Sequence, residues 1–356
     1  MEALFNSHKV KYEKLNELIN KELIQLGNTV DVYINLENII NKLTARIYVE
    51  ELLTDNKDDY MYRFISNVCN IGAHYKSYFT KRGIDCRVFI YMQYPFDCKN
   101  IKNRSILPEY REYYDFKFTR NAGNSAVSKM INDAVPFIKI ILEYIQGVYF
   151  IESGRAENSV VPYIIDSNST ITKFIVSDKL YDFQYVNHGF NIIIPKKEKS
   201  VIMTYGNAVD IIKKMNGVKN EVSFKPELIP FIVSIVGSEH RNIYKVKGLA
   251  VKRVFSLLQA AIEAKLIAPN TNNPYLLIEN VVQHKYREQV FNNFYCVDIE
   301  YQYKMLNVQD IQHITKQMTD KFDNNSLKEI NDKYFKDYPL MVMELTSVGK
   351  KKKLKF

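Results

Sequence analysis

The sequence predicts an α/β protein in which a parallel β-sheet covered by helices is followed by a mostly helical region. Over about the first 220 residues, short β-branched and apolar segments alternate with helical patterns. This alternation is typical of parallel sheets whose strands are joined by helices. From about residue 225 onward, the apolar pattern becomes mostly helical. We therefore expect two domains, residues 1–222 and residues 223–356.

The strands and helices are expected in a definite order along the chain. The predicted strands are residues 30–35 (VDVYIN), 87–92 (RVFIYM), 147–151 (GVYFI) and 172–176 (TKFIV), followed by a hairpin of residues 190–194 and 201–205. The predicted helices are residues 59–81 and 134–145 in the first region, and residues 226–236, 249–266, 274–294 and 308–322 in the second.

Composition favours a polyanionic partner and disfavours several other classes. The chain has 49 Lys and Arg against 40 Asp and Glu, a net charge of +9, which suits nucleic acid. Its four cysteines form no CxxC pair and no zinc-spaced cluster, as expected for reduced thiols. No apolar stretch approaches membrane-spanning length, so we expect no membrane partner. The abundant Tyr, Phe, Ile, Asn and Lys have AT-rich codons, which fits an AT-rich genome such as a viral one. The polar, charged start is not a secretory signal, so we expect a cytoplasmic protein, in the host cytoplasm or the virion if it is viral.

A basic segment between two predicted helices has the features of a phosphate-binding loop. Residues 237–252 read GSEHRNIYKVKGLAVK, and no acidic residue lies between positions 241 and 253. Gly248 permits a tight helix entry, after which the amides of Leu249 and Ala250 would point outward, and helix N-termini bind phosphate. The alternative is a solvated basic connection between two helices. The cations of this segment are Arg241, Lys245, Lys247, Lys252 and Arg253.

The same segment resembles the helix-three-turn-helix motif of the flap endonuclease and 5′→3′ exonuclease superfamily, whose nuclease domain is PIN-like. The motif's two aspartates are Ser238 and Arg241 in this chain. The resemblance implies that the loop grips duplex or branched DNA, with a monovalent cation at the loop. The motif positions kept here are Gly237, Asn242, Ile243, Val246, Gly248 and Lys252. The DNA contacts that the resemblance implies are Lys245, Lys247, Gly248, Leu249, Ala250, Lys252 and Arg253.

Further segments resemble the family in the same order, so that the resemblance spans about residues 28–266. Residues 104–111 (RSILPEYR) resemble the segment that leads to the arch over the family's active site, which implies DNA contacts from Arg104 and Arg111. Residues 154–159 (GRAENS) resemble a helix start that carries three acidic residues in the family. Those acidic positions are Ala156, Asn158 and Ser159 here.

Carboxylates that bind metal in this family are therefore scarce. The first strand ends in Asn35 where the family has Asp, and only Asp178, after the fourth strand, keeps its place. Hydrolysis in this family needs clustered carboxylates that hold two divalent ions about 4 Å apart. We expect at most weak binding of Mg²⁺ or Mn²⁺ here, with no confident catalytic residue. The candidate metal ligands are Asp178, Glu152, Glu157, Glu37 and Asp182.

The sequence thus favours a catalytically impaired, DNA-binding relative of 5′-nucleases, acting with other protein subunits in a viral or other nucleic-acid-processing assembly. Two alternatives stay open: an active metal-dependent nuclease with relocated carboxylates, and a structural or interaction subunit that no longer binds DNA. We expect Asn35, Glu152 and Asp178 at the carboxyl ends of neighbouring parallel strands, facing one cleft, because ligand sites of open α/β sheets gather there.

Overall fold

A computed structural model describes most of the chain. The described residues are 15, 19–20, 24–38, 57–95, 123–143, 145–154, 157–166, 170–195, 200–219, 224–238, 243–268 and 271–318. Arg104, Arg111 and Arg241, for which we expect DNA contacts or motif positions, lie outside these residues.

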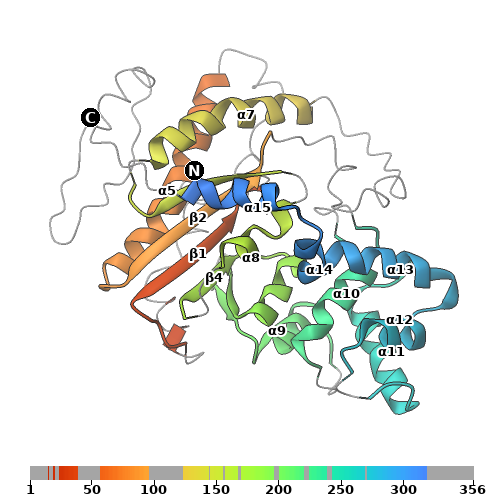
Figure 1. Cartoon of the computed structure of the whole chain (residues 1–356). Helices are drawn as coiled ribbons and strands as arrows, with labels where there is room; N and C mark the ends of the chain where they lie inside the picture. Colours follow the sequence, from red (N-terminus) through yellow and green to blue (C-terminus); the bar gives the residue numbers. More distant parts are fainter. Residues whose placement is uncertain are drawn as a thin grey trace.

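The molecule is built around one six-stranded sheet with the order β3-β2-β1-β4-β5-β6 (Figure 1). The first five strands in this order are parallel, and β6 runs antiparallel to β5. This confirms the predicted α/β class and the predicted hairpin. The strands are β1 (Thr29–Asn35), β2 (Asp85–Gln93), β3 (Val148–Ser153), β4 (Thr172–Val176), β5 (Phe190–Ile194) and β6 (Val201–Met203).

Alternate residues of each strand face two different apolar layers. In β1, Val30, Val32 and Ile34 belong to a core cluster shared with α5 (Lys57–Thr80) and α7 (Gly123–Leu142). Tyr33 points to the other face and belongs to a second cluster, as the two-residue repeat of a strand requires. The second face carries α8 (Val161–Ile165), η2 (Glu157–Ser159), η3 (Leu180–His188) and α9 (Ala208–Met215).

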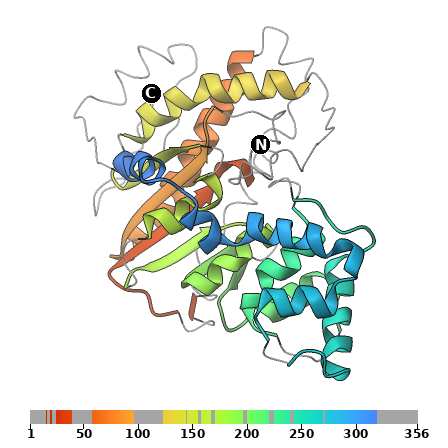
Figure 2. The same cartoon turned by 45° about the vertical axis from the view of Figure 1, so that its right-hand side comes forward.

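The helical region packs on this second face (Figures 1 and 2). Its apolar residues, among them Phe231 and Phe255, belong to the same cluster as Tyr33. Apolar residues before and after the predicted domain boundary at residue 222 therefore belong to one core cluster. The elements are η4 (Pro226–Leu228), α10 (Ile229–Val236), α11 (Val251–Glu263), α12 (Pro274–Val281), α13 (His284–Val297), α14 (Ile299–Lys304), α15 (Val308–Thr315) and η6 (Lys316–Met318).

One predicted helix is interrupted. Residues 274–294 form two helices, α12 and α13, because Val282 and Gln283 adopt extended backbone angles between them. Arg287 of α13 donates hydrogen bonds to the carbonyl oxygens of Val282 and Glu279, which satisfies the end of α12. Among the described residues, no helix is long and apolar enough to cross a membrane.

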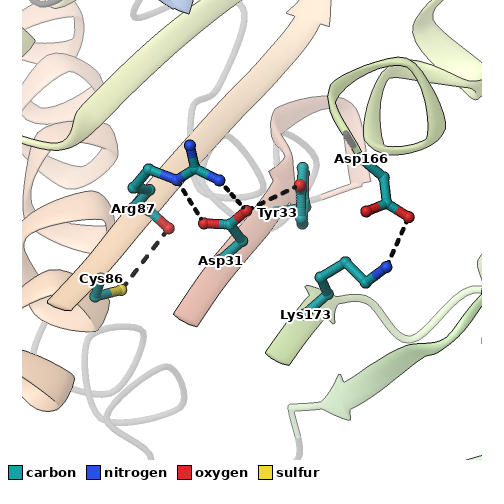
Figure 3. A network of polar contacts seen from close by, with 6 residues as sticks. All are labelled: Asp31, Tyr33, Cys86, Arg87, Asp166 and Lys173. Atoms are coloured by element: carbon teal, nitrogen blue, oxygen red, sulfur yellow. Dashed lines mark hydrogen bonds and ion pairs between the residues drawn. The ribbon is translucent and has the colours of Figure 1, made fainter. Parts of the chain in front are cut away.

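A network of charged side chains joins neighbouring strands near their amino-terminal ends (Figure 3). Asp31 and Arg87 are cross-strand partners, and the guanidinium donates two hydrogen bonds to the carboxylate, at 2.7 and 2.6 Å. On the other side, Lys173 of β4 pairs with Asp166 at 2.6 Å. Burial, and then the nearby Asp31 carboxylate, raise the pKa of Tyr33. Each charged side chain of this network is paired with one of opposite sign, so we assign the network a role in stabilising the fold.

Candidate functional site

The carboxyl ends of the central strands bring polar side chains together on the second face of the sheet. Asn35 is the last residue of β1, Gln93 of β2 and Ser153 of β3, while Ser177 directly follows β4. All four are at most 3% exposed. Asn35, Ser153 and Ser177 stand where parallel strands end at one edge, which is where open α/β sheets form their sites. We call the polar residues gathered here the strand-end cluster.

The first half of the cluster surrounds Asp182 of η3. Its carboxylate Oδ2 accepts one hydrogen bond from the Asn38 amide and another from the Ser177 hydroxyl, each at 2.6 Å. The Ser177 hydroxyl in turn accepts the backbone amide of Lys179 at 3.0 Å. Asp182 is only 2% exposed, so these donors replace the water that an ionised carboxylate would otherwise need.

The second half surrounds Glu37, which follows β1. Its Oε1 accepts the backbone amide of Gln93 at 3.0 Å and the side-chain amide of Asn158 at 2.9 Å. The carbonyl oxygen of Asn158 is 3.1 Å from the Ser153 hydroxyl. Glu37 and Asp182, both predicted metal ligands, are therefore brought to the same edge. Each of them binds an asparagine amide there.

Asn35 completes the cluster from β1. Its carbonyl oxygen accepts the backbone amide of Glu37 at 3.0 Å, which directs the amide nitrogen away from that contact. The nitrogen is buried and has no hydrogen-bond partner. An unpaired buried donor of this kind costs about 1–3 kcal/mol. A cation would not relieve this cost, because an N–H group repels positive charge.

Asp178 is the one carboxylate that keeps its family position in the sequence. It is not part of the hydrogen bonds described above for Glu37 and Asp182. Its Oδ1 is 3.4 Å from the ammonium nitrogen of Lys179, and both side chains are 28% exposed. Asp178 thus lies beside a cation two residues after the end of β4, and β4 neighbours β1 as expected.

Glu152 does not face the cluster, which corrects the expectation that it shares a cleft with Asn35 and Asp178. It alternates with Val148 and Phe150, which belong to the layer of α5 and α7. There its carboxylate lies 3.1 Å from the ammonium of Lys139 on α7. In addition, β2 separates β3 from β1.

Glu157 is turned away as well, toward the C-terminal helices. Burial raises the pKa of its carboxyl, and the adjacent Asp310 of α15 raises it further. One of its oxygens is buried without a partner. Glu157 therefore lies against another acid, and this geometry does not bring it to Glu37 or Asp182.

Residues 299–318 bond to the β3–η2 segment at two further points. Gln302 accepts a hydrogen bond from the Ser159 hydroxyl at 2.6 Å and donates one to Tyr181 at 2.8 Å. Gln317 accepts the backbone amide of Glu152 at 2.9 Å and donates to its carbonyl oxygen at 2.8 Å. Both contacts join residues far apart in sequence, and sequence patterns carry no signal for either glutamine.

The described residues do not fit a divalent metal pair. Among them, no group of three or more His, Cys, Asp or Glu side chains could hold an ion. Hard cations such as Mg²⁺ require several oxygen ligands, including anionic ones. Here one oxygen of Glu37 and one oxygen of Asp182 accept hydrogen bonds from amide and hydroxyl donors. Among the described residues, Glu37 and Asp182 lie together at the strand ends, whereas Glu152 and Glu157 face other partners. Weak metal binding at this edge stays a prediction.

The basic loop forms a second, exposed region between α10 and α11. Ser238 and Ile243 pair through two backbone hydrogen bonds of 2.9 Å, and Val246 donates to Ile235 at 2.7 Å. Ile243 and Val246 are buried and anchor the loop. Between and after these anchors the exposed residues are Lys245, Lys247, Gly248, Ala250, Lys252 and Arg253.

Glycines permit both turns of this loop. Gly237 has φ 75°, and a Cβ there would lie 2.6 Å from the carbonyl oxygen of Ile243. Gly248 has φ 79°, and no atom lies within 4 Å of its Cβ position, so that turn is open to a ligand. The two predicted amides differ, because Leu249 donates to Val246 at 3.1 Å inside the turn. The Leu249 amide is therefore not directed outward.

Two residues that the sequence did not single out hold the loop in place. Asn293 of α13, fully buried, donates to the carbonyl oxygens of Ser234 at 2.6 Å and Tyr244 at 2.7 Å. Gln289, one turn earlier, donates to the same Tyr244 oxygen at 3.3 Å. One buried amide thus connects the end of α10, the loop and α13.

Comparisons with known proteins find solved structures but no sequence relatives. No protein-family model and no curated protein matches this chain. The flap endonuclease of bacteriophage T5, solved as a pseudo-enzyme–product complex with DNA and metal ions, shares 13% identity, with a TM-score of 0.49, over 80% of this chain and 97% of that one. The T5 5′-exonuclease with bound zinc shares 12% identity over 81% and 97%, also with a TM-score of 0.49.

Proposed function

We propose that this protein binds DNA, duplex or branched, without cutting it, as a catalytically impaired relative of 5′-nucleases. The observation that carries the proposal is the exposed basic loop on buried anchors. Lys245, Lys247, Lys252 and Arg253 are exposed, and no ion pair joins any of them to another described residue. Cations held on a rigid turn, and not neutralised internally, are the type of group that contacts phosphates.

The helix that follows adds to this surface. The cap residue of α11 is Ala250, which offers no side-chain acceptor, and its first turn holds no acidic residue. The first amides of a helix lack partners within the helix, and its dipole favours an anion. Lys252 and Arg253 lie in that turn, where the positive end of the helix dipole repels cations. A bound phosphate would attract both the dipole and the two side chains.

The strand-end cluster supports the second half of the proposal, that cleavage is lost. The acids that remain at the sheet edge accept hydrogen bonds from Asn38, Ser177, Asn158 and the Gln93 backbone. Two-metal hydrolysis needs those oxygens for ions that activate water and stabilise the leaving group. In this proposal residues 1–222 supply the inactive sheet and residues 223–356 supply the DNA-binding loop, inside an assembly with other proteins.

A salt series on a triple variant tests DNA binding. Replacing Lys245, Lys247 and Lys252 with Ala should weaken duplex binding and lower the slope of log affinity against log salt by about three units. The matched control removes three exposed lysines, one directly after α5, one on α7 and one on α14: Lys81→Ala, Lys129→Ala, Lys304→Ala. It makes the same change in net charge. Equal slopes for the two variants would show that the loop is not the DNA site.

Cleavage assays test the loss of activity. Flap and single-stranded substrates with Mg²⁺ or Mn²⁺ should remain intact at protein concentrations that saturate binding. Metal-dependent cleavage that vanishes in Asp178→Ala protein would instead favour an active nuclease with relocated ligands.

A further inference from the structure

We propose that the side-chain amides of Asn38 and Asn158 take the place of cations at the sheet edge, so that the strand-end cluster is a metal-independent structural centre. The inference rests on the part of the proposed function that denies this edge a metal pair. It goes beyond the proposed function, because it assigns the strand-end cluster a role in stabilising the fold.

The first argument is electrostatic. At this edge Asp182 and Asn158 are each 2% exposed, and Glu37 is partly buried. A carboxylate removed from water needs either a cation or several hydrogen-bond donors. Asn38 supplies a donor to Asp182 at 2.6 Å and Asn158 supplies one to Glu37 at 2.9 Å. Each amide carries two N–H donors and no charge, so it binds a carboxylate oxygen without adding a positive charge.

The second argument is connectivity. The contact from Asn38 to Asp182 joins the segment after β1 to η3, and Ser177 adds the end of β4. The contact from Asn158 to Glu37 joins η2 to the segment after β1, and the Gln93 amide adds the end of β2. Five chain segments therefore meet through two carboxylates. A shared metal pair would draw such segments together in the same way.

The third argument concerns shape. Asparagine and aspartate have nearly the same volume, so Asn38→Asp and Asn158→Asp would leave the packing unchanged. Each substitution exchanges a donor for an anion and brings two carboxylates into contact. Such a pair repels unless a proton or a cation lies between them. The wild-type cluster should therefore ignore divalent ions, and the substituted cluster should depend on them.

Thermal unfolding of the full-length protein without DNA tests the inference. Wild type should melt at the same temperature in EDTA, in Mg²⁺ and in Mn²⁺. In EDTA, Asn38→Asp should lower Tm by about 5 °C or more, because two buried carboxylates in contact repel each other. Millimolar Mn²⁺ should restore much of that loss. The control is Asn272→Asp, which makes the same charge change at an exposed position and should melt like wild type.

The possible outcomes separate this inference from the proposed function. A wild-type Tm that rises in Mn²⁺ and falls in EDTA would overturn both the inference and the claim of lost metal chemistry. An Asn38→Asp protein that melts with the Asn272→Asp control in EDTA would overturn the inference alone. DNA binding by the basic loop is unaffected by either result.

A second variant covers the case in which Asn38→Asp does not fold in EDTA or in Mn²⁺. Asn38→Ala removes the donor without adding a charge. The inference requires a lower Tm that Mn²⁺ does not restore, since no new carboxylate is present. An Asn38→Ala protein as stable as wild type would overturn it.

Discussion

The strand-end cluster and the basic loop treat charge in opposite ways. In the cluster, the carboxylates of Glu37 and Asp182 bond to neighbouring amides and hydroxyls within the fold. In the loop, Lys245, Lys247 and Lys252 are exposed, and the apolar anchors beneath them do the packing. The comparison shows that a carboxylate oxygen that accepts hydrogen bonds within the fold is less accessible to a ligand than an exposed lysine. In the proposed function, the strand-end cluster therefore serves stability and the basic loop serves binding.

The largest effect should come from removing an acceptor at the centre of the cluster. Asp182→Ala leaves the buried Asn38 amide and Ser177 hydroxyl without their shared partner. We expect a loss of about 3 kcal/mol in the free energy of unfolding, measured by urea denaturation. The control is Asp178→Ala, whose partly exposed ion pair should contribute less than about 1 kcal/mol. Equal losses for the two variants would contradict the division between cluster and rim.

A smaller loss is expected where the helical region and the loop meet. Asn293→Ala removes both hydrogen bonds that hold Ser234 and Tyr244, and should cost about 2 kcal/mol because two buried carbonyls lose a donor. The loop should also loosen, so hydrogen exchange of residues 243–250 should accelerate and DNA affinity should fall. Asn280→Ala, at a position on α12 whose amide bonds only within its own helix, serves as control. Unchanged exchange in the Asn293 variant would remove the link between this anchor and the loop.

The smallest effect on stability should come from the loop cations themselves. The triple variant Lys245→Ala, Lys247→Ala, Lys252→Ala should unfold within about 0.5 kcal/mol of wild type, since exposed side chains away from special features contribute little. Its DNA affinity should nevertheless fall strongly. A large loss of stability would mean that these lysines serve packing, and the comparison between the two regions would fail.

The positions of strands and turns could be predicted from the sequence better than the contacts between side chains. Strand β4 and strand β5 begin and end where apolar, β-branched patterns predict, because a buried strand is a local signal. The loop at Gly248 was also predictable, since a positive φ and a helix entry leave a local trace. Asp178 was predicted from its place in a motif, but its orientation toward Lys179 could not be predicted that way.

Contacts between distant segments account for what the sequence could not predict. Asn38 meets Asp182 across 144 residues, and Asn293 meets Tyr244 across 49. Glu152 lies on the opposite face from the one predicted, because the alternation of side chains along β3 directs it to Lys139 of α7. Pairings of this kind depend on the folded topology, and no spacing rule within a single sequence specifies them.

Gln317 has a consequence for how this protein behaves in concentrated solution. Strand β3 is at an edge of the sheet, and an uncovered edge offers its amides and carbonyls to any other chain that can pair with it. The primary amide of Gln317 presents one N–H group and one oxygen to the backbone of Glu152, just as the peptide group of an adjacent strand would. A single side chain thus occupies the hydrogen-bonding groups that a seventh strand would use at this point, and we expect it to disfavour pairing of this edge with another chain.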